Sequence, residues 1–182
     1  MNALETALAE LAGRLESAGT AYMVVGGFAN LQWGRPRLTQ DLDVTVATTE
    51  ARLPELLAAL APEFQARAID PVAFALETGV VPITSVNGVL VDLMIARLAF
   101  EHDAIARAHS LPVGGRLVRF ATAEDLILQK IVSERLRDRE DIEGIVRRQR
   151  GKLDLEYLRP RVRALAVALE RPNLLEELER LL

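Results

Sequence analysis

The stretch VVGGFANLQWGRPRLTQDLDVTV, residues 24–46, decides how the chain folds. It opens with the end of an apolar run over 21–25, which predicts a buried strand, and two glycines follow. Residues 28–33 fit a short helix, and 34–40 form a polar loop that contains a proline. The alternating, β-branched segment 41–47 predicts a second strand.

Two carboxylates lie on that second strand. Asp41 and Asp43 are two residues apart, so both side chains point to the same face of a sheet. Carboxylates this close raise each other's pKa unless a cation lies between them. Hard oxygen ligands favour Mg²⁺ or Mn²⁺, so the pair predicts a metal site. A solvated strand start is the alternative interpretation.

A third carboxylate, Asp92, stands inside the apolar run VLVDLMI, residues 89–95. A lone aspartate in a buried strand is costly unless it is paired or bound to a metal. If this strand lies beside 41–47, three carboxylates converge on a site for one or two metal ions and for phosphoryl-type transfer. The alternative is a structural aspartate paired with an arginine.

The two glycines, Gly26 and Gly27, end the first strand and lead into the short helix. Backbone N–H groups and the positive end of a helix dipole at such a place suit a phosphate group. An ordinary tight turn is the alternative.

Outward from this region, the chain mixes helices and strands to about residue 120 and is helical afterwards. Segments 80–86 and 89–95, joined by Asn87-Gly88, give the strongest hairpin signal. One strand followed by irregular chain is expected within 64–77, and another strand at 116–120. The expected longer helices are 2–18, 49–61, 99–109, 123–136, 139–149, 154–169 and 172–181.

These elements predict an α/β fold with a twisted mixed sheet and flanking helices. We expect an α/β core over 1–120 and a helical region over 121–182 that completes a cleft. The 182 residues are 50% hydrophobic and 26% charged, which is typical of a globular protein.

Composition also excludes several classes of site. The absence of cysteine excludes thiolate catalysis, zinc–thiolate sites and iron–sulfur clusters. No apolar run is long enough to span a membrane, and no signal peptide is evident, so a cytoplasmic protein is expected. The net charge of -4 gives no overall basic field for nucleic acid.

The pattern of these residues resembles the nucleotidyltransferase superfamily, which has the polymerase-beta-like fold. The resemblance rests on Gly26, Gly27, Arg37, Asp41, Asp43 and Asp92. The form GGFANLQWGRPRLTQDLD is most similar to the AbiEii-type branch, which includes toxins of abortive-infection and MenT-like toxin–antitoxin pairs. That branch typically adds a lysine on a helix and then a basic-D-x-x-D stretch. Here DLILQKIVSERLRDREDI supplies Lys130, Arg137, Asp138 and Asp141.

The resemblance implies an enzyme that moves a nucleoside monophosphate from an NTP to an acceptor hydroxyl with Mg²⁺ or Mn²⁺. The implied nucleotide-binding residues are Gly26, Gly27, Arg37, Thr39 and Lys130. Asp41 and Asp43 would bind the metals, and Asp92 would be a further metal ligand or the general base. Lys130 would contact a phosphate or the leaving pyrophosphate, and Asp138 or Asp141 would position Lys130 or the acceptor.

The acceptor stays open among several classes. The toxin branch implies an RNA, such as a tRNA end, or a protein hydroxyl, together with a cognate antitoxin. A small antibiotic-like molecule is the second hypothesis, and a non-catalytic nucleotide- or partner-binding protein is the third. Arginines within 147–163 fit an RNA backbone or a solvated helix face.

The lysine and the two later aspartates also have plain interpretations. Lys130 and Glu134 fit an i,i+4 pair on a solvated helix face. Asp138 and Asp141 fit a solvated helix start within the charged run RLRDREDIE.

Overall fold

The computed structural model describes residues 2–182, and the chain divides into two compact units. Unit 1 comprises the chain up to Phe28 together with Leu38–Ala121, and unit 2 comprises Ala29–Arg37 and Thr122–Leu182. The division falls inside α2 (Gly26–Trp33), so the short helix of the deciding stretch belongs to both units.

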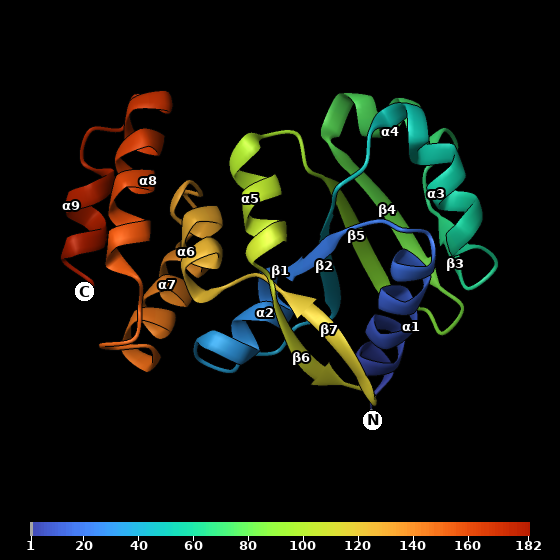
Figure 1. Cartoon of the computed structure of the whole chain (residues 1–182), viewed down its shortest axis with the longest axis horizontal. Coiled ribbons are helices and arrows are strands. Elements are labelled where there is room, and N and C mark those ends of the chain that lie inside the picture. Colours follow the sequence, from blue (N-terminus) through green and yellow to red (C-terminus); the bar gives the residue numbers. More distant parts are fainter. Residues whose placement is uncertain (1) are drawn as a thin grey trace. The chain divides into compact units, whose positions relative to one another are not determined.

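Unit 1 holds a seven-stranded mixed sheet in the order β3-β4-β5-β2-β1-β7-β6 (Figure 1). The strands are β1 (Tyr22–Val25), β2 (Asp41–Val46), β3 (Phe64–Ala66), β4 (Val80–Ser85), β5 (Leu90–Ile95), β6 (His109–Val113) and β7 (Arg116–Phe120). Its helices are α1 (Ala3–Ser17), the short 3₁₀ helix η1 (Glu50–Arg52), α3 (Leu53–Leu60), α4 (Pro71–Thr78) and α5 (Ala99–Arg107). The predicted α/β class and mixed sheet are confirmed.

Strands β2, β4 and β5 share one buried face. Strand β2 pairs parallel with β5 and antiparallel with β1, and β4 pairs antiparallel with β5. Leu42, Val44, Val91 and Leu93 are fully buried on one face. The alternate residues of β4 and β5 on the other face are half-buried or exposed. This alternation is typical of a sheet that is packed on one side and accessible on the other.

The expected hairpin is confirmed, while the chain on either side of it differs from the prediction. Irregular chain was expected after the strand in 64–77, but α4 forms there. Its signals are present in the sequence, since Asp70 caps the helix, Pro71 is its first residue and Gly79 ends it at a φ of 75°. The sequence also does not predict strand β6, because it favours a helix over the whole of 99–109, whereas α5 stops at Arg107.

Unit 2 is helical. It contains the second part of α2, then α6 (Ala123–Ile131), α7 (Leu136–Arg148), α8 (Leu155–Ala168) and α9 (Leu174–Glu179). The boundary expected between helices 123–136 and 139–149 is wrong, because α6 ends at Ile131 and α7 begins at Leu136. Among residues 2–182, no helix is long and apolar enough to cross a membrane.

Candidate functional site

The three sheet aspartates lie on neighbouring strands of unit 1. Asp43 on β2 is the direct cross-strand partner of Asp92 on β5, and Asp41 pairs with Leu90 in the same register. Partners in a ladder share a face, and Asp41 lies two residues before Asp43, so all three side chains are on the accessible face. Segments 41–47 and 89–95 are therefore neighbours, which is the condition for the three carboxylates to share one site.

Asp92 has little to offset its negative charge. Burial raises the pKa of Asp92, the charge of Arg67 opposes that rise, and the charge of Asp41 adds to it. Within residues 2–182, no side chain or backbone N–H donates a hydrogen bond to Asp92, and it forms no ion pair. The structure therefore does not contain the arginine–Asp92 pair of the alternative interpretation.

Gly26 is needed because Asp43 lies directly against it. Gly26 has a φ of 61°, in the left-handed region, and a Cβ at this position would overlap the Asp43 carboxylate. Helix α2 begins at this glycine. The Gly-Gly sequence therefore brings a helix start and a carboxylate into contact, which is more specific than an ordinary turn.

The aspartates were also predicted to hold a metal ion. In the part of the chain from residue 2 onward, no group of three or more His, Asp or Glu side chains is close enough to do so. The Asp43 carboxylate lies against Gly26, and Asp41 accepts a hydrogen bond of 3.2 Å from the Thr39 hydroxyl. The donor chemistry still suits a hard cation, since Asp92 is half-buried and has no cationic partner in contact.

A second group of charged residues forms in unit 2 around Lys130. The Lys130 Nζ donates to Asp138 Oδ1 at 2.8 Å and to Asp141 Oδ2 at 2.7 Å. Only 6% of the lysine is exposed, and both aspartates are buried. The interpretation of these three residues as solvated surface charges is therefore wrong. The expected link between Lys130 and the later aspartates is present in the structure.

The same aspartates receive further donors. Arg37 Nε and Nη2 donate to the two oxygens of Asp141 at 3.0 and 3.1 Å, and Arg135 Nε donates to Asp138 Oδ2 at 2.7 Å. Burial alone would raise the pKa of Asp141 and of Asp138. The hydrogen bonds from Lys130 and from the arginines outweigh burial, so both pKa values fall below the usual range.

Asn30 is a further residue of this group, which the sequence does not predict. Its Nδ2 donates to Asp141 Oδ1 and to the carbonyl of Arg35, both at 3.0 Å, and it is fully buried. Asn30 therefore fastens the basic loop to α7. The available signal was a single amide inside the short segment 28–33, which gives no reason to expect a contact with residue 141.

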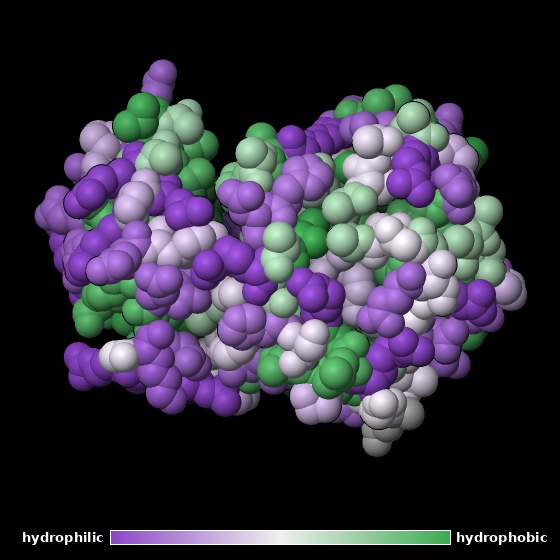
Figure 2. All heavy atoms as spheres, in the orientation of Figure 1, coloured by the Kyte–Doolittle hydropathy of each residue, from purple (hydrophilic) through white to green (hydrophobic). Residues whose placement is uncertain are grey.

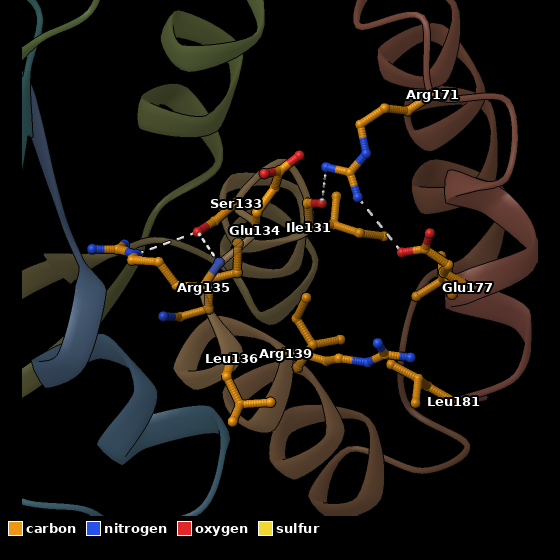
Figure 3. A pocket seen from close by; sticks show the side chains of 12 residues that line it. Ile131, Ser133, Glu134, Arg135, Leu136, Arg139, Arg171, Glu177 and Leu181 are labelled. Atoms are coloured by element: carbon orange, nitrogen blue, oxygen red, sulfur yellow. Dashed lines mark hydrogen bonds and ion pairs between the residues drawn. The ribbon is translucent and has the colours of Figure 1, made fainter.

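A hollow of about 320 Å³ lies next to Lys130 in unit 2 (Figure 3). Arg171 projects into it and donates to the carbonyls of Ile131 and Val132, at the end of α6, and its partner Glu177 lies 3.6 Å away. An arginine engaged in this way caps a helix C-terminus. The contacts around this hollow are thus explained by the packing of the helices of unit 2.

The arginine-rich stretch 147–163 is partly engaged within the same unit. Arg148 donates to the carbonyls of Leu31 and Gly34, at the end of α2. Arg159 pairs with Glu179 at 2.7 Å, and Arg161 lies over the Tyr157 ring. These contacts reduce the number of guanidinium groups that an RNA backbone would find without a partner.

The chain matches a family of known proteins over almost its whole length. The family model described as "Nucleotidyl transferase of unknown function (DUF2204)" matches residues 4–180. No curated protein matches the chain by sequence.

Solved structures of nucleotidyltransferases share the fold at low sequence identity. ANT(2'')-Ia in complex with adenylyl-2''-tobramycin has a TM-score of 0.60 at 19% identity, over 93% of this chain and 99% of that one. An antigenic nucleotidyltransferase-like protein from Paracoccidioides brasiliensis has 0.54 at 18%, over 97% and 92%. The lincosamide antibiotic adenylyltransferase LnuA, with lincomycin bound, has 0.50 at 12%, over 78% and 95%.

Proposed function

Because the chain belongs to the family of nucleotidyl transferases of unknown function, we propose that it transfers a nucleoside monophosphate from an NTP to an acceptor hydroxyl. The observation that carries this proposal is the register of the sheet, which sets Asp43 beside Asp92, with Asp41 on the same face and Gly26 against Asp43. Carboxylates held together at this cost are typical of functional sites.

In the proposed reaction, the acceptor oxygen attacks the α-phosphorus of the NTP. The new O–P bond forms while the bond to the β-phosphate oxygen breaks, and pyrophosphate leaves. The acceptor proton passes to the carboxylate of Asp92, whose raised pKa suits a general base. Catalysis then consists mainly of positioning and of neutralising the developing charge.

Asp41 and Asp43 are the residues that would hold Mg²⁺ or Mn²⁺, while Asp92 is assigned to the acceptor proton. When bound, the cation would neutralise phosphate charge in the transition state. Gly26 and Gly27 offer backbone N–H groups at the start of α2 to the triphosphate, and Thr39 holds Asp41.

The residues of unit 2 have a supporting part in this proposal. Within unit 2, Asp138 and Asp141 engage two of the three N–H donors of Lys130. Arg37 is held by the same Asp141, so the basic loop is fixed before a nucleotide binds.

The remaining alternatives differ in the acceptor that receives the nucleoside monophosphate. The AbiEii-type resemblance favours RNA or protein and a cognate antitoxin. ANT(2'')-Ia and LnuA are associated with tobramycin and lincomycin, which favours a small-molecule acceptor. We propose the small-molecule class on this ground.

The test is transfer of label from each NTP, labelled at the α-phosphate, with Mg²⁺ or with EDTA. Separate reactions contain total RNA, the protein alone, or a panel of small hydroxylated compounds. We expect Mg²⁺-dependent label on a small compound, lost in Asp41→Asn and kept in the control Glu55→Gln, an exposed α3 residue. Label on RNA or on the protein would reassign the acceptor. Binding of Mg²⁺-NTP without transfer to anything would support the non-catalytic alternative.

A further inference from the structure

Asn30, on the part of α2 that belongs to unit 2, is a polar side chain with no exposed surface. Hydrophilic residues cover much of the surface over α8 and α9 of the same unit in the space-filling view, where they meet water (Figure 2). Asn30 must instead find its partners inside the protein. Its Nδ2 finds two of them, but its Oδ1 accepts no hydrogen bond within residues 2–182. A buried carbonyl oxygen without a donor costs stability, so the two donated bonds are what this side chain supplies.

The two hydrogen bonds of Asn30 fix Arg37 from two sides. One goes to the carbonyl of Arg35, two residues earlier in the chain, and holds the backbone. The other goes to Asp141 Oδ1, the same oxygen that accepts from Arg37 Nε at 3.0 Å. Arg37 Nη2 completes the contact at Asp141 Oδ2, and such a two-point contact sets the direction of a guanidinium as well as its distance. Asn30 thus holds both the loop that carries Arg37 and the carboxylate that receives it.

Two glycines allow the loop to lie close enough for these bonds. A Cβ on Gly34 would overlap Asn30 Oδ1, and a Cβ on Gly144 of α7 would lie 3.0 Å from the backbone nitrogen of Arg35. The loop is therefore packed between α2 and α7, with no room for a side chain at either contact. This packing restricts the directions in which Arg37 can point.

From these contacts we infer that Asn30 is a positioning residue, which orients Arg37 for contact with a phosphate group of the nucleotide. This inference rests on the proposed function, in which Arg37 binds the NTP. About a quarter of the Arg37 side chain, 25%, is exposed, so a ligand can reach it, whereas Asn30 is covered and acts through Arg37 alone. Ordering the arginine in advance raises affinity, because it does not have to be ordered when the ligand binds.

The probe for this role is inorganic tripolyphosphate with Mg²⁺, which carries the phosphates of an NTP without its base. Its dissociation constant is measured by calorimetric titration of the full chain. Asn30→Leu, which nearly keeps the volume and removes both donated bonds, should weaken binding about fivefold, and Arg37→Gln about tenfold. Asn173→Ala, at an exposed asparagine whose side chain forms no capping bond, is the matched control and should bind as the unaltered protein does. Unaltered binding by Asn30→Leu would overturn the inference.

The double variant Asn30→Leu/Arg37→Gln separates positioning from general support of the fold. If Asn30 acts through Arg37, the double variant should bind only about tenfold more weakly than the unaltered protein, as Arg37→Gln alone does. Independent losses would instead multiply to about fiftyfold and would contradict the inference. An unchanged dissociation constant in Arg37→Gln would contradict it as well. If thermal melting shows that Asn30→Leu does not fold, Asn30→Ser replaces it in the cycle, because its one O–H can serve only one of the two acceptors.

Transfer kinetics separate this inference from the proposed function. With an active acceptor, Asn30→Leu should raise the KM for the NTP about fivefold and change kcat by less than about twofold. Transfer with an unchanged KM would reject the positioning role and retain the enzyme. Non-additive binding of tripolyphosphate with no nucleotidyl transfer to any acceptor would retain the positioning of Arg37 and reject the reaction.

Discussion

The aspartates of the sheet and the aspartates of the helices form two contrasting groups in one chain. Asp138 and Asp141 are buried and receive donors from Lys130, Arg135 and Arg37, and their pKa values are lowered. Burial raises the pKa of the half-buried Asp92, Arg67 opposes the rise without pairing with it, and the charge of Asp41 adds to it. The more deeply buried carboxylates, Asp138 and Asp141, therefore have lowered pKa values, whereas the less buried Asp92 has a raised one.

The contrast teaches which carboxylates serve folding and which are kept for a ligand. A buried carboxylate with a full set of donors is stabilised in its charged form and needs nothing more. A carboxylate on an accessible sheet face, with repulsion and no paired cation, is held at a cost to stability. The same residue type thus supports opposite conclusions at the two places.

The largest expected effect comes from breaking the neutralised group. Lys130→Met leaves the carboxylates of Asp138 and Asp141 buried without their shared cation. We expect the free energy of unfolding, measured by urea denaturation, to fall by about 3–5 kcal/mol. Lys152→Met, at an exposed lysine in a turn, is the matched control and should change it by less than about 0.5 kcal/mol. Equal effects of the two substitutions would show that the Lys130 pairs do not hold unit 2 together.

The next largest effect is expected on activity, which should be lost while stability is kept. Asp41→Asn removes a charge that repels Asp92 on the neighbouring strand. We expect nucleotidyl transfer to fall by about 10²–10³-fold, while the melting temperature stays the same or rises. Initial rates with labelled NTP and calorimetric melting measure the two quantities. A variant that keeps full activity would remove that aspartate from the proposed site.

The sequence predicts the group of aspartates on the sheet better than it predicts the group on the helices. The sheet group is largely predictable, because alternation sets the faces and the Asn87-Gly88 hairpin sets the neighbour of β5. The environment of Asp141 is not, since its donors Asn30 and Arg37 are more than a hundred residues away in the chain. No local pattern encodes such a contact.

Local sequence patterns also do not predict that Lys130 is buried. Lys130, Ser133, Glu134 and Arg137 have the spacing of a solvated helix stripe, which requires the helix to continue through 136. The helix ends at Ile131 instead, and α7 turns back so that Asp138 and Asp141 cover the lysine. Pairing of charges across helices outweighed the periodicity of the sequence.

A smaller effect is expected at the glycine that contacts the sheet group. Gly26→Ala places a methyl group at a positive φ and against the Asp43 carboxylate, so the carboxylate must move. We expect a loss of about 2–3 kcal/mol in unfolding free energy, together with reduced transfer activity. Gly19→Ala is the matched control, since Gly19 has a φ of 64° with nothing within 4 Å. It should lose only about 1 kcal/mol. Equal losses of unfolding free energy in the two variants would mean that the Asp43 carboxylate moves aside without a cost in stability.

The smallest expected effect is the pH dependence of stability, which differs in sign between the two groups. The raised pKa of Asp92 means that the folded state holds this proton more tightly than the unfolded state. Its contribution to stability is full below the unfolded pKa of about 3.9 and is lost as pH rises through the folded pKa. The lowered pKa of Asp141 gives a contribution that is present above about 3.9 and lost as pH falls through its folded pKa. Urea denaturation at a series of pH values should therefore show Asp92→Asn gaining on the unaltered protein with rising pH, and Asp141→Asn losing to it. Parallel curves for the two variants would mean that the two environments do not differ in the way their contacts indicate.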